Sequence, residues 1–240
     1  MILNDMENIK SVIFDMYETL FPNSSESWLE VFRSIVETQH LAVSSNKLWA
    51  VWKAKDKVFR QERINLQNPF ESPPFRTYFM SWKDTFSNTF TELGLVGDAE
   101  HAANCCIKRM AEKPPFDDTL PTLTLLSGEF DLGILSNADN AYALPLIDRY
   151  ALPVKCVVTS ETAKAYKPHP EAFKMILERM EVSSRQSLYV GDNPLDDIWG
   201  GAMSGLTTVW LNRDNVKWEN SLPKPSYEIH NLSQLVTILS

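Results

Sequence analysis

The fold is decided by residues 11–20, which read SVIFDMYETL. The first four residues are rich in β-branched and aromatic side chains, and they predict a short buried strand. Asp15 stands where that strand should end, and Thr19 follows four residues later. Open α/β sheets place their chemistry at the carboxyl ends of their strands. An Asp after a strand can equally be a turn former or a helix N-cap, so this stretch alone leaves both interpretations open.

The same pattern of an apolar strand followed by polar residues recurs later in the chain. The recurrences are residues 132–135 before Ser136 and Asn137, residues 156–158 ahead of Lys167, and residues 188–190 before Gly191 and Asp192. In a parallel sheet, all these polar residues would converge on one edge. Helical segments of about ten residues separate the strands, which indicates βαβ units. We therefore predict an α/β fold with a parallel sheet of about five or six strands, the last of them near residues 207–210 and 227–229.

Between the first and second strands the sequence changes to a helical period. Apolar spacing predicts four helices, which are one that begins after residues 23–25, one over 45–63, one over 78–93 and one over 98–113. Pro114 and Pro115 end the last of them. We expect a helical insert at residues 22–113 and an α/β core built from residues 1–21 and 114–240. The Trp and Phe residues of the insert are interpreted mainly as core packing rather than as a substrate-stacking surface.

The composition excludes several classes of function. The 240 residues include 44% hydrophobic and 22% charged side chains, which is the balance of a globular protein. The net charge of −8 and the lack of a Lys/Arg cluster argue against nucleic acid or a membrane as a partner. Because the first residues are acidic and no run of about 18 apolar residues occurs, we expect a cytoplasmic protein. For its assembly we expect a monomer or a homodimer. The three cysteines have no zinc or redox spacing and are expected to be reduced.

Four motifs, taken together and in this order, resemble those of the haloacid dehalogenase superfamily of hydrolases. They are FDMYETL at residues 14–20, LSN at 135–137, YKP at 166–168 with Pro170 and Glu171, and VGDNPLDD at 190–197. The resemblance covers the whole chain. It implies a Rossmann-like α/β core with an all-helical cap domain inserted after the first strand, and an enzyme that acts on a small-molecule substrate.

The resemblance also implies a role for each motif. Asp15 would be the nucleophile that forms a covalent ester with the substrate, which water then releases, so that one difficult displacement becomes two easier ones. Ser136 and Asn137 would donate hydrogen bonds to the transferring group. Lys167 would neutralise charge between Asp15 and the substrate. The candidate substrate-binding residues are Thr19, Tyr17 and Asn193.

A divalent metal is implied by the same resemblance. Its ligands would be the carboxylates of Asp15 and Asp192, the main-chain carbonyl of Tyr17, and a further acid. Asp197 fits the position of that further acid, and Asp196 competes with it. Carboxylates that converge around one lysine leave an excess of negative charge, which is costly in a dry pocket without a cation. Mg²⁺ is the natural choice for hard oxygen ligands in a phosphate site.

The motifs fit neither of two branches of the superfamily completely. Its phosphatases usually carry a second acid two residues after the nucleophile, where this chain has Tyr17, and a phenol with a pKa near 10 is a poor acid at neutral pH. An aromatic residue there resembles the 2-haloacid dehalogenases, whose halide leaving group needs no proton. Those enzymes lack the Gly-Asp pair kept here at Gly191 and Asp192, and they need no metal. Glu18 could supply the missing acid, but it is interpreted as an exposed loop charge.

Three hypotheses for the function remain open at this point. The leading hypothesis is a Mg²⁺-dependent phosphatase acting on a small metabolite, because Asp192 and Asp197 make sense with a metal. The second is a metal-independent hydrolase like the 2-haloacid dehalogenases, which Tyr17 favours. The third is a binding or regulatory protein that keeps the fold with little turnover.

Overall fold

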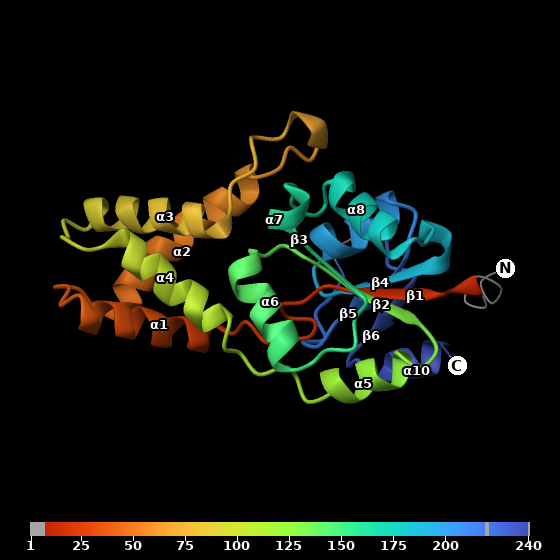
Figure 1. Cartoon of the computed structure of the whole chain (residues 1–240). Coiled ribbons are helices and arrows are strands. Elements are labelled where there is room, and N and C mark those ends of the chain that lie inside the picture. The colour runs from red at the N-terminus through yellow and green to blue at the C-terminus, as the bar shows by residue number, and fades with distance from the viewer. Residues whose placement is uncertain (1–7, 219–220, 240) are drawn as a thin grey trace. The chain divides into compact units, whose positions relative to one another are not determined.

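A parallel sheet organises the computed structural model, which describes residues 8–218 and 221–239. Within these residues the sheet has six strands in the order β3-β2-β1-β4-β5-β6, and all neighbours are parallel (Figure 1). The strands are β1 (Ser11–Phe14), β2 (Asp131–Ser136), β3 (Cys156–Thr159), β4 (Ser187–Gly191), β5 (Thr207–Leu211) and β6 (Tyr227–Ile229). The predicted α/β fold with a parallel sheet is thus confirmed. Residues 1–7, which open the predicted core, lie outside the described residues.

Several strands extend beyond the apolar runs that predicted them. Ser136 belongs to β2 because it pairs with Thr159 of β3, and Gly191 belongs to β4 because it pairs with Trp210 of β5. The end of a strand depends on the neighbour that accepts its hydrogen bonds, and a hydrophobicity pattern does not record that neighbour.

Helices cover both faces of the sheet. α8 (Pro170–Met180) lies on one face, and α5 (Thr119–Leu126) and α10 (Ser233–Leu239) lie together on the other (Figure 1). The buried side chains under α8 come from five strands or their flanks and from the helix itself: Ile13, Leu135, Val158, Tyr189, Leu206, Ala172, Phe173 and Ile176. A Cβ on Gly133 would collide with the sulfur of Met180, so this glycine lets α8 approach β2 closely.

The segment after β4 is not a single regular α-helix. It forms a π-helix, η4 (Pro194–Trp199), followed by the short α9 (Gly200–Met203). The carbonyl of Asn193 accepts hydrogen bonds from the N–H groups of both Asp197 (3.0 Å) and Ile198 (3.2 Å). The second of these spans five residues and widens the turn, a feature that often occurs at functional sites. The remaining short elements are η2 (Pro69–Glu71), α7 (Ser160–Ala163) and η3 (Ser184–Gln186).

The chain divides into two units. Among the described residues, one unit holds those up to Pro22, Pro114–Asn137 and those from Ile147 onward. The other unit holds Asn23–Lys113 with Ala138–Leu146. In the second unit α1 (Ser25–Thr38), α2 (Ser45–Glu62), α3 (Tyr78–Glu92) and α4 (Ala99–Met110) pack in succession, and α1 also contacts α4. Its bounds differ from the predicted insert mainly by residues 138–146, which include the start of α6 (Asn140–Arg149). Among the described helices, none is both long and apolar enough to cross a membrane.

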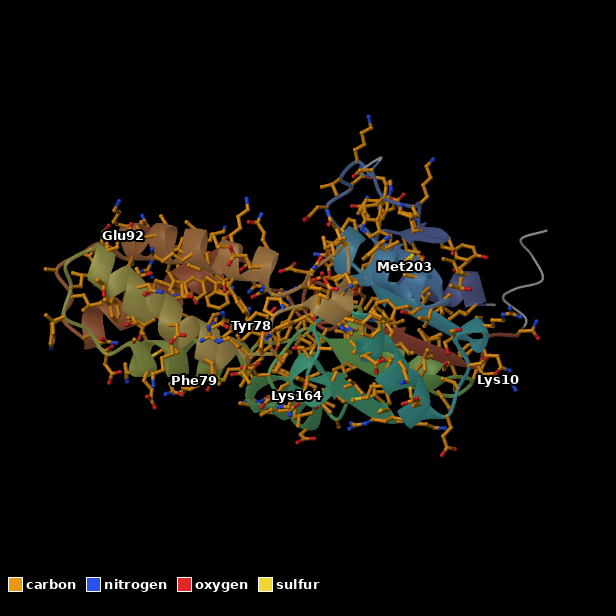
Figure 2. The ribbon with its side chains drawn as sticks, turned by 90° about the horizontal axis from the view of Figure 1, so that it is seen from above. Lys10, Tyr78, Phe79, Glu92, Lys164 and Met203 are labelled. Atoms are coloured by element: carbon orange, nitrogen blue, oxygen red, sulfur yellow. The ribbon has the colours of Figure 1, made fainter. Side chains whose placement is uncertain are left out.

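Two contacts explain why residues 138–146 group with the helices. The buried carboxylate of Asp139 accepts hydrogen bonds from the N–H groups of Tyr78 (2.8 Å) and Phe79 (2.7 Å). These two residues begin α3, at the end opposite Glu92 (Figure 2). The ring of Tyr142 stacks on Trp82 with 5.9 Å between their centroids. Both contacts join residues that are 60 or so positions apart, which a local pattern does not reveal.

The aromatic residues of the helical unit form its core. Trp52 and Trp82 are each 1% exposed, and Trp28 stacks on Trp52 with centroids 5.5 Å apart. The buried carboxylate of Asp56 accepts a hydrogen bond from Trp82 Nε1 (3.1 Å) and one from Arg60 Nε (2.6 Å). The interpretation of these aromatic side chains as packing is therefore confirmed for the buried ones.

Candidate active site

The sequence order of the strands brings the polar motifs to one edge of the sheet. β1 and β4 are neighbours, and the chain leaves β1 toward β2 on one side before it returns to β4 on the other. Such a reversal of strand order is where open α/β sheets bind their ligands. Asp15 follows β1 and Asp192 follows β4, and the N–H of Asp15 donates to the carbonyl of Val190 (2.8 Å). The predicted convergence of strand ends is present here.

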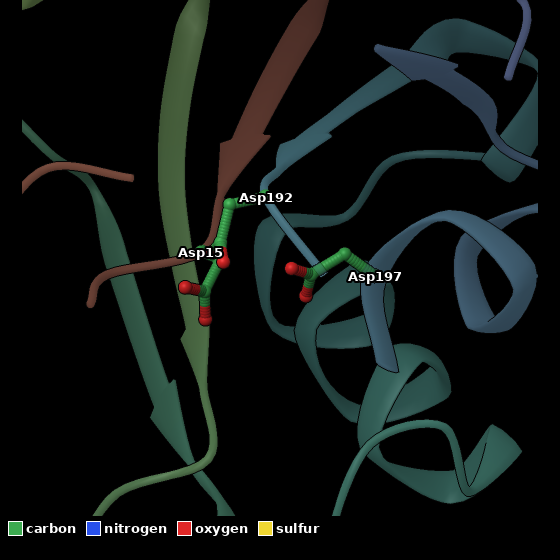
Figure 3. A group of neighbouring side chains, drawn as sticks. All are labelled: Asp15, Asp192 and Asp197. Carbon is green, nitrogen blue, oxygen red and sulfur yellow. The ribbon is translucent and has the colours of Figure 1, made fainter. Parts of the chain in front are cut away.

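Three carboxylates meet at this edge (Figure 3). Asp15, Asp192 and Asp197 each present a carboxylate oxygen, and these oxygens lie within 4.8 Å of one another. Asp197 reaches the group from η4 and is 1% exposed. Its neighbour Asp196 faces elsewhere and accepts a hydrogen bond from Asn137 Nδ2 (3.0 Å). Of the two acids that the sequence offered, the structure therefore places Asp197 in the group.

Lys167 is the cation beside these acids. Its side chain is 2% exposed, and its Nζ donates to Asp15 Oδ1 (2.6 Å), to Asp197 Oδ1 (2.5 Å) and to Tyr189 Oη (2.8 Å). Ionised, the three carboxylates carry three negative charges against one positive charge on Lys167. Full ionisation of the three acids would thus leave an excess of negative charge in the site.

Burial and mutual repulsion change the proton affinities in the site. Burial raises the pKa of Asp15 from 3.8 to about 7, with Lys167 acting to lower it and Asp197 to raise it. Burial, together with the charges of Asp197 and Asp15, also raises the pKa of Asp192 well above its usual range. For Lys167, burial acts to lower the pKa, but the charges of Asp15 and Asp197 outweigh it and raise the pKa well above 10.5. Lys167 is therefore charged, and the acids would ionise more easily beside a further cation.

Asn137 is held by the segment that carries Lys167. Its Oδ1 accepts from the backbone N–H of Lys167 (2.7 Å), and its Nδ2 donates to the carbonyl of Lys167 (3.1 Å) and to Asp196 Oδ2 (3.0 Å). The peptide bond from Lys167 to Pro168 is cis. Both amide hydrogens of Asn137 are engaged within the chain, so a hydrogen bond from this side chain to a substrate would replace one of these contacts.

The other predicted site residues lie around the carboxylates. Ser136 is buried at the end of β2, and Tyr17 is half-buried in an isolated bridge with Phe21. Thr19 is fully buried, and its Oγ1 donates to Asp192 Oδ1 (3.2 Å). The Oδ1 of Asn193 accepts from two backbone N–H groups at the start of η4 (2.9 Å each). Thr19 and Asn193 thus support Asp192 and η4 through contacts within the chain.

Glu18 is half-buried rather than exposed, in contrast to its interpretation as an exposed loop charge. The chain turns back here, with Glu18 at a φ of 66° and its N–H donating to the carbonyl of Phe21 (2.7 Å). Together with Asp192, Trp210 and others it lines a cavity of about 370 Å³. Its charge adds to the effects that raise the pKa of Asp192.

Two residues near the site escaped the motif analysis. Tyr189 contacts Lys167 from the middle of β4, where its aromatic character predicted only a strand. Arg213 donates to both carboxylate oxygens of Asp118 (2.9 Å each) and to the carbonyl of Thr19 (3.0 Å). The partners of Arg213 are 95 and 194 positions away, so local spacing gives no sign of them. For Tyr189, the alternation of β4 offered a signal, since it puts Tyr189 and Gly191 on the same face.

A comparison with known families settles the class of the protein. The profile of the haloacid dehalogenase-like hydrolases matches residues 9–205, a span that runs from the start of β1 past α9. The chain belongs to this family. The haloacid dehalogenase-like resemblance found in the motifs is thereby confirmed, and the protein is a hydrolase of this family.

Relatives of this haloacid dehalogenase-like hydrolase include enzymes that cleave different bonds. The HAD-hydrolase YfnB of Bacillus subtilis is 27% identical over 251 residues, which cover 98% of this chain and 97% of that protein. The (S)-2-haloacid dehalogenase 1 of Pseudomonas sp. (strain CBS-3) is 23% identical, with 98% of each chain covered. Human N-acylneuraminate-9-phosphatase is also 23% identical and covers 98% of this chain and 95% of its own. A crystal structure of YfnB bound to magnesium has a TM-score of 0.77 at 22% identity, with 97% of this chain and 99% of that chain covered.

Proposed function

We propose that this hydrolase is a Mg²⁺-dependent phosphatase that acts on a phosphate ester of a small metabolite, with Asp15 as its nucleophile. The observation that carries the proposal is the group of three carboxylates within 4.8 Å of one another, whose charges the single positive charge of Lys167 offsets only in part. A hydrolase that displaced halide from carbon would gain nothing from this excess negative charge. A site that binds a cation gains from it directly.

The residues present fit Mg²⁺. They offer hard carboxylate oxygens at short mutual distances, in a buried place where unpaired negative charge is costly. Asp15, Asp192 and Asp197 would hold the ion, with the main-chain carbonyl of Tyr17 as a further ligand. When bound, Mg²⁺ supplies positive charge that stabilises the negative oxygens of a transferring phosphoryl group. The same ion would lower the pKa of Asp15 and keep its carboxylate ionised for attack.

The reaction then proceeds in two displacements. A carboxylate oxygen of Asp15 attacks phosphorus, the bond from phosphorus to the ester oxygen breaks, and the ester oxygen leaves with that electron pair as an alkoxide that takes a proton from solvent water. Water next attacks the phosphorus of the aspartyl phosphate, which releases phosphate and restores the carboxylate. Lys167 holds Asp15 through the contact of 2.6 Å and offsets part of the charge that develops. Asn137 fixes the backbone of Lys167 and so acts on the step through that residue.

A second candidate function is a 2-haloacid dehalogenase-like hydrolase that works without a metal. Tyr17 favours it, because the position that carries an acid in phosphatases holds an aromatic residue here. A relative of this activity among the compared proteins adds to its support. In this case Asp15 would attack the carbon that bears the halogen, halide would leave without a proton, and water would hydrolyse the resulting ester.

A paired assay separates the two functions. Phosphate release from p-nitrophenyl phosphate and halide release from a 2-chloro acid are each measured with Mg²⁺ and with a chelator. Asp15→Asn removes the nucleophile with little change of shape, and Asp131→Asn is the matched control, because Asp131 begins β2 at the opposite edge of the sheet and forms an exposed ion pair with Lys155.

Phosphate release that requires Mg²⁺ and disappears only in Asp15→Asn is the expected result. Halide release that a chelator leaves unchanged would overturn the phosphatase proposal in favour of the second candidate. If neither product appears across a panel of phosphate esters and 2-halo acids, both candidate functions fail and a binding role takes their place.

A further inference from the structure

Lys167 has a third partner besides the two carboxylates. A lysine ammonium carries three N–H donors. They are directed at Asp15 Oδ1 (2.6 Å), Asp197 Oδ1 (2.5 Å) and Tyr189 Oη (2.8 Å). All three donors are therefore used inside the protein, and the ammonium cannot rotate without breaking a contact. Two of the partners belong to the group of acids already described, whereas Tyr189 is a neutral residue of the sheet.

The hydroxyl of Tyr189 is suited to receive this third hydrogen. It lies 3.0 Å from the carbonyl oxygen of Leu135 and 3.2 Å from Asp197 Oδ1. A phenol has a single hydrogen and donates to one of these acceptors at a time, so its lone pair is free to accept from Lys167. The hydroxyl thus links the ammonium to the backbone of β2, next to Ser136.

The ring of Tyr189 is fixed by its surroundings. Tyr189 is fully buried on β4, in register with Ile13 of β1, and its ring packs edge-on against Phe173 of α8 with centroids 5.2 Å apart. The sheet and α8 hold the ring on two sides. Because the ring does not move, the position of its hydroxyl is determined by the sheet.

We propose that Tyr189 is a positioning residue for catalysis, whose hydroxyl fixes the direction of the Lys167 ammonium and, through it, the orientation of the Asp15 carboxylate. The proposal rests on the proposed function in one respect, because it takes Asp15 as the nucleophile. A flexible lysine chain with two carboxylate partners could pair with either acid in several geometries. The third contact from a rigid ring selects one of them, so that one oxygen of Asp15 is held and the other is left for attack.

Tyr189→Phe tests this role, since it removes only the hydroxyl. Loss of a partner that orients a reacting group commonly costs about 10–100-fold in activity. We expect kcat to fall in that range with KM changed less than about twofold, because Tyr189 is fully buried and acts through Lys167. Tyr142→Phe is the matched control: it makes the same change in another buried tyrosine, in the helical unit, and should retain the wild-type kcat.

A second measurement reports on Lys167 without any turnover. In ¹⁵N-labelled protein with Mg²⁺, a lysine ammonium with three fixed acceptors should give a slowly exchanging signal, which Lys167→Met identifies by its absence. In Tyr189→Phe that signal should shift and broaden, because one donor loses its acceptor and exchange with water becomes faster. In Tyr142→Phe it should stay unchanged.

The outcomes distinguish this proposal from the proposed function. A Tyr189→Phe protein with wild-type kcat and an unchanged lysine signal would overturn the positioning role while leaving Asp15 catalysis intact. An equal loss of kcat in Tyr189→Phe and Tyr142→Phe would overturn it as well, since it would trace the loss to general destabilisation. If the wild-type protein hydrolyses no phosphate ester, a lysine signal changed only in Tyr189→Phe would still support the contact, and the failure would belong to the proposed function.

Discussion

Gly191 lies directly against the carboxylate of Asp197, so close that a Cβ at position 191 would overlap the Cβ and Cγ of Asp197. The glycine before Asp192 therefore makes room for another acid of the same site. Its backbone φ is unremarkable, so the requirement is one of space. The Gly-Asp pair and Asp197 form one structural unit, and Asp197 cannot be placed as observed with a larger residue at 191.

This relationship predicts that Gly191→Ala disturbs the carboxylate group more than it disturbs the rest of the folded structure. The methyl group must push Asp197 out of the carboxylate group, so we expect Mg²⁺ affinity to fall at least about tenfold, in line with the loss of a supporting contact at a metal site. Gly128→Ala is the control, because a Cβ there makes only an ordinary contact with the carbonyl of Leu125. Calorimetric titration with Mg²⁺ measures both variants. Equal affinities for wild type and Gly191→Ala would show that Asp197 has no part in binding the ion.

The two neighbouring acids of η4 are predicted to have separate functions. Asp197→Asn removes a charge from the carboxylate group and should abolish Mg²⁺ binding or weaken it strongly. Asp196→Asn keeps an oxygen that can accept from Asn137 Nδ2, so it should leave Mg²⁺ affinity within a few-fold of wild type. The same titration compares the pair, each variant serving as the other's control. Loss of affinity in Asp196→Asn alone would reverse the assignment.

Tyr17 predicts a strong dependence of the phosphatase rate on the leaving group. Tyr17 offers a phenol where an acid usually stands. A leaving group that is a weak base needs no proton and should depart readily, whereas an alkyl alkoxide should depart slowly. We expect p-nitrophenyl phosphate to be hydrolysed about 10²–10⁴-fold faster than simple alkyl phosphates, which is the rate factor that general acid catalysis supplies. Tyr17→Asp should raise kcat for alkyl phosphates and should change kcat for p-nitrophenyl phosphate much less. Steady-state rates on both substrate types give the answer, with Tyr17→Phe as the control for loss of the hydroxyl. A Tyr17→Asp protein that is slower on both would contradict this explanation.

The sequence predicted the parts of the site that depend on which residue follows each strand. Asp15, Ser136 and Asp192 were placed correctly at strand ends because each directly follows or ends an apolar run, and parallel strands must bring such residues to one edge. The resemblance favoured Asp197 over Asp196, and Asp197 is the one that joins Asp15 and Asp192 in the structure. Spacing alone left both open, because adjacent residues point in different directions and the π-helical turn decides which one faces the sheet. Spacing could not foresee that geometry.

Other features depend on contacts between distant segments. Asn137 was assigned to the substrate by resemblance, whereas its side chain makes three hydrogen bonds within the chain, to Lys167 and Asp196. Tyr189 was counted only as part of a strand, because the alternation of β4 gives the face on which Tyr189 lies but not its contact with Lys167. The grouping of residues 138–146 with the helices has the same cause, because it depends on side chains that meet only in the folded chain.

The contacts of Asp139 are predicted to stabilise the folded protein. Its buried carboxylate accepts from the first two N–H groups of α3, while Thr77 accepts from the N–H of Met80. Asp139→Ala would leave two N–H groups at the helix start without an acceptor, so the free energy of unfolding should fall by about 2–3 kcal/mol, the range for hydrogen bonds to a charged group. Asp98 caps α4 through one exposed hydrogen bond to the N–H of His101, and Asp98→Ala should cost only about 1 kcal/mol. Urea unfolding followed by circular dichroism compares the two variants. If Asp98→Ala proved as costly as Asp139→Ala, the bidentate contact of Asp139 would not be what holds residues 138–146 to α3.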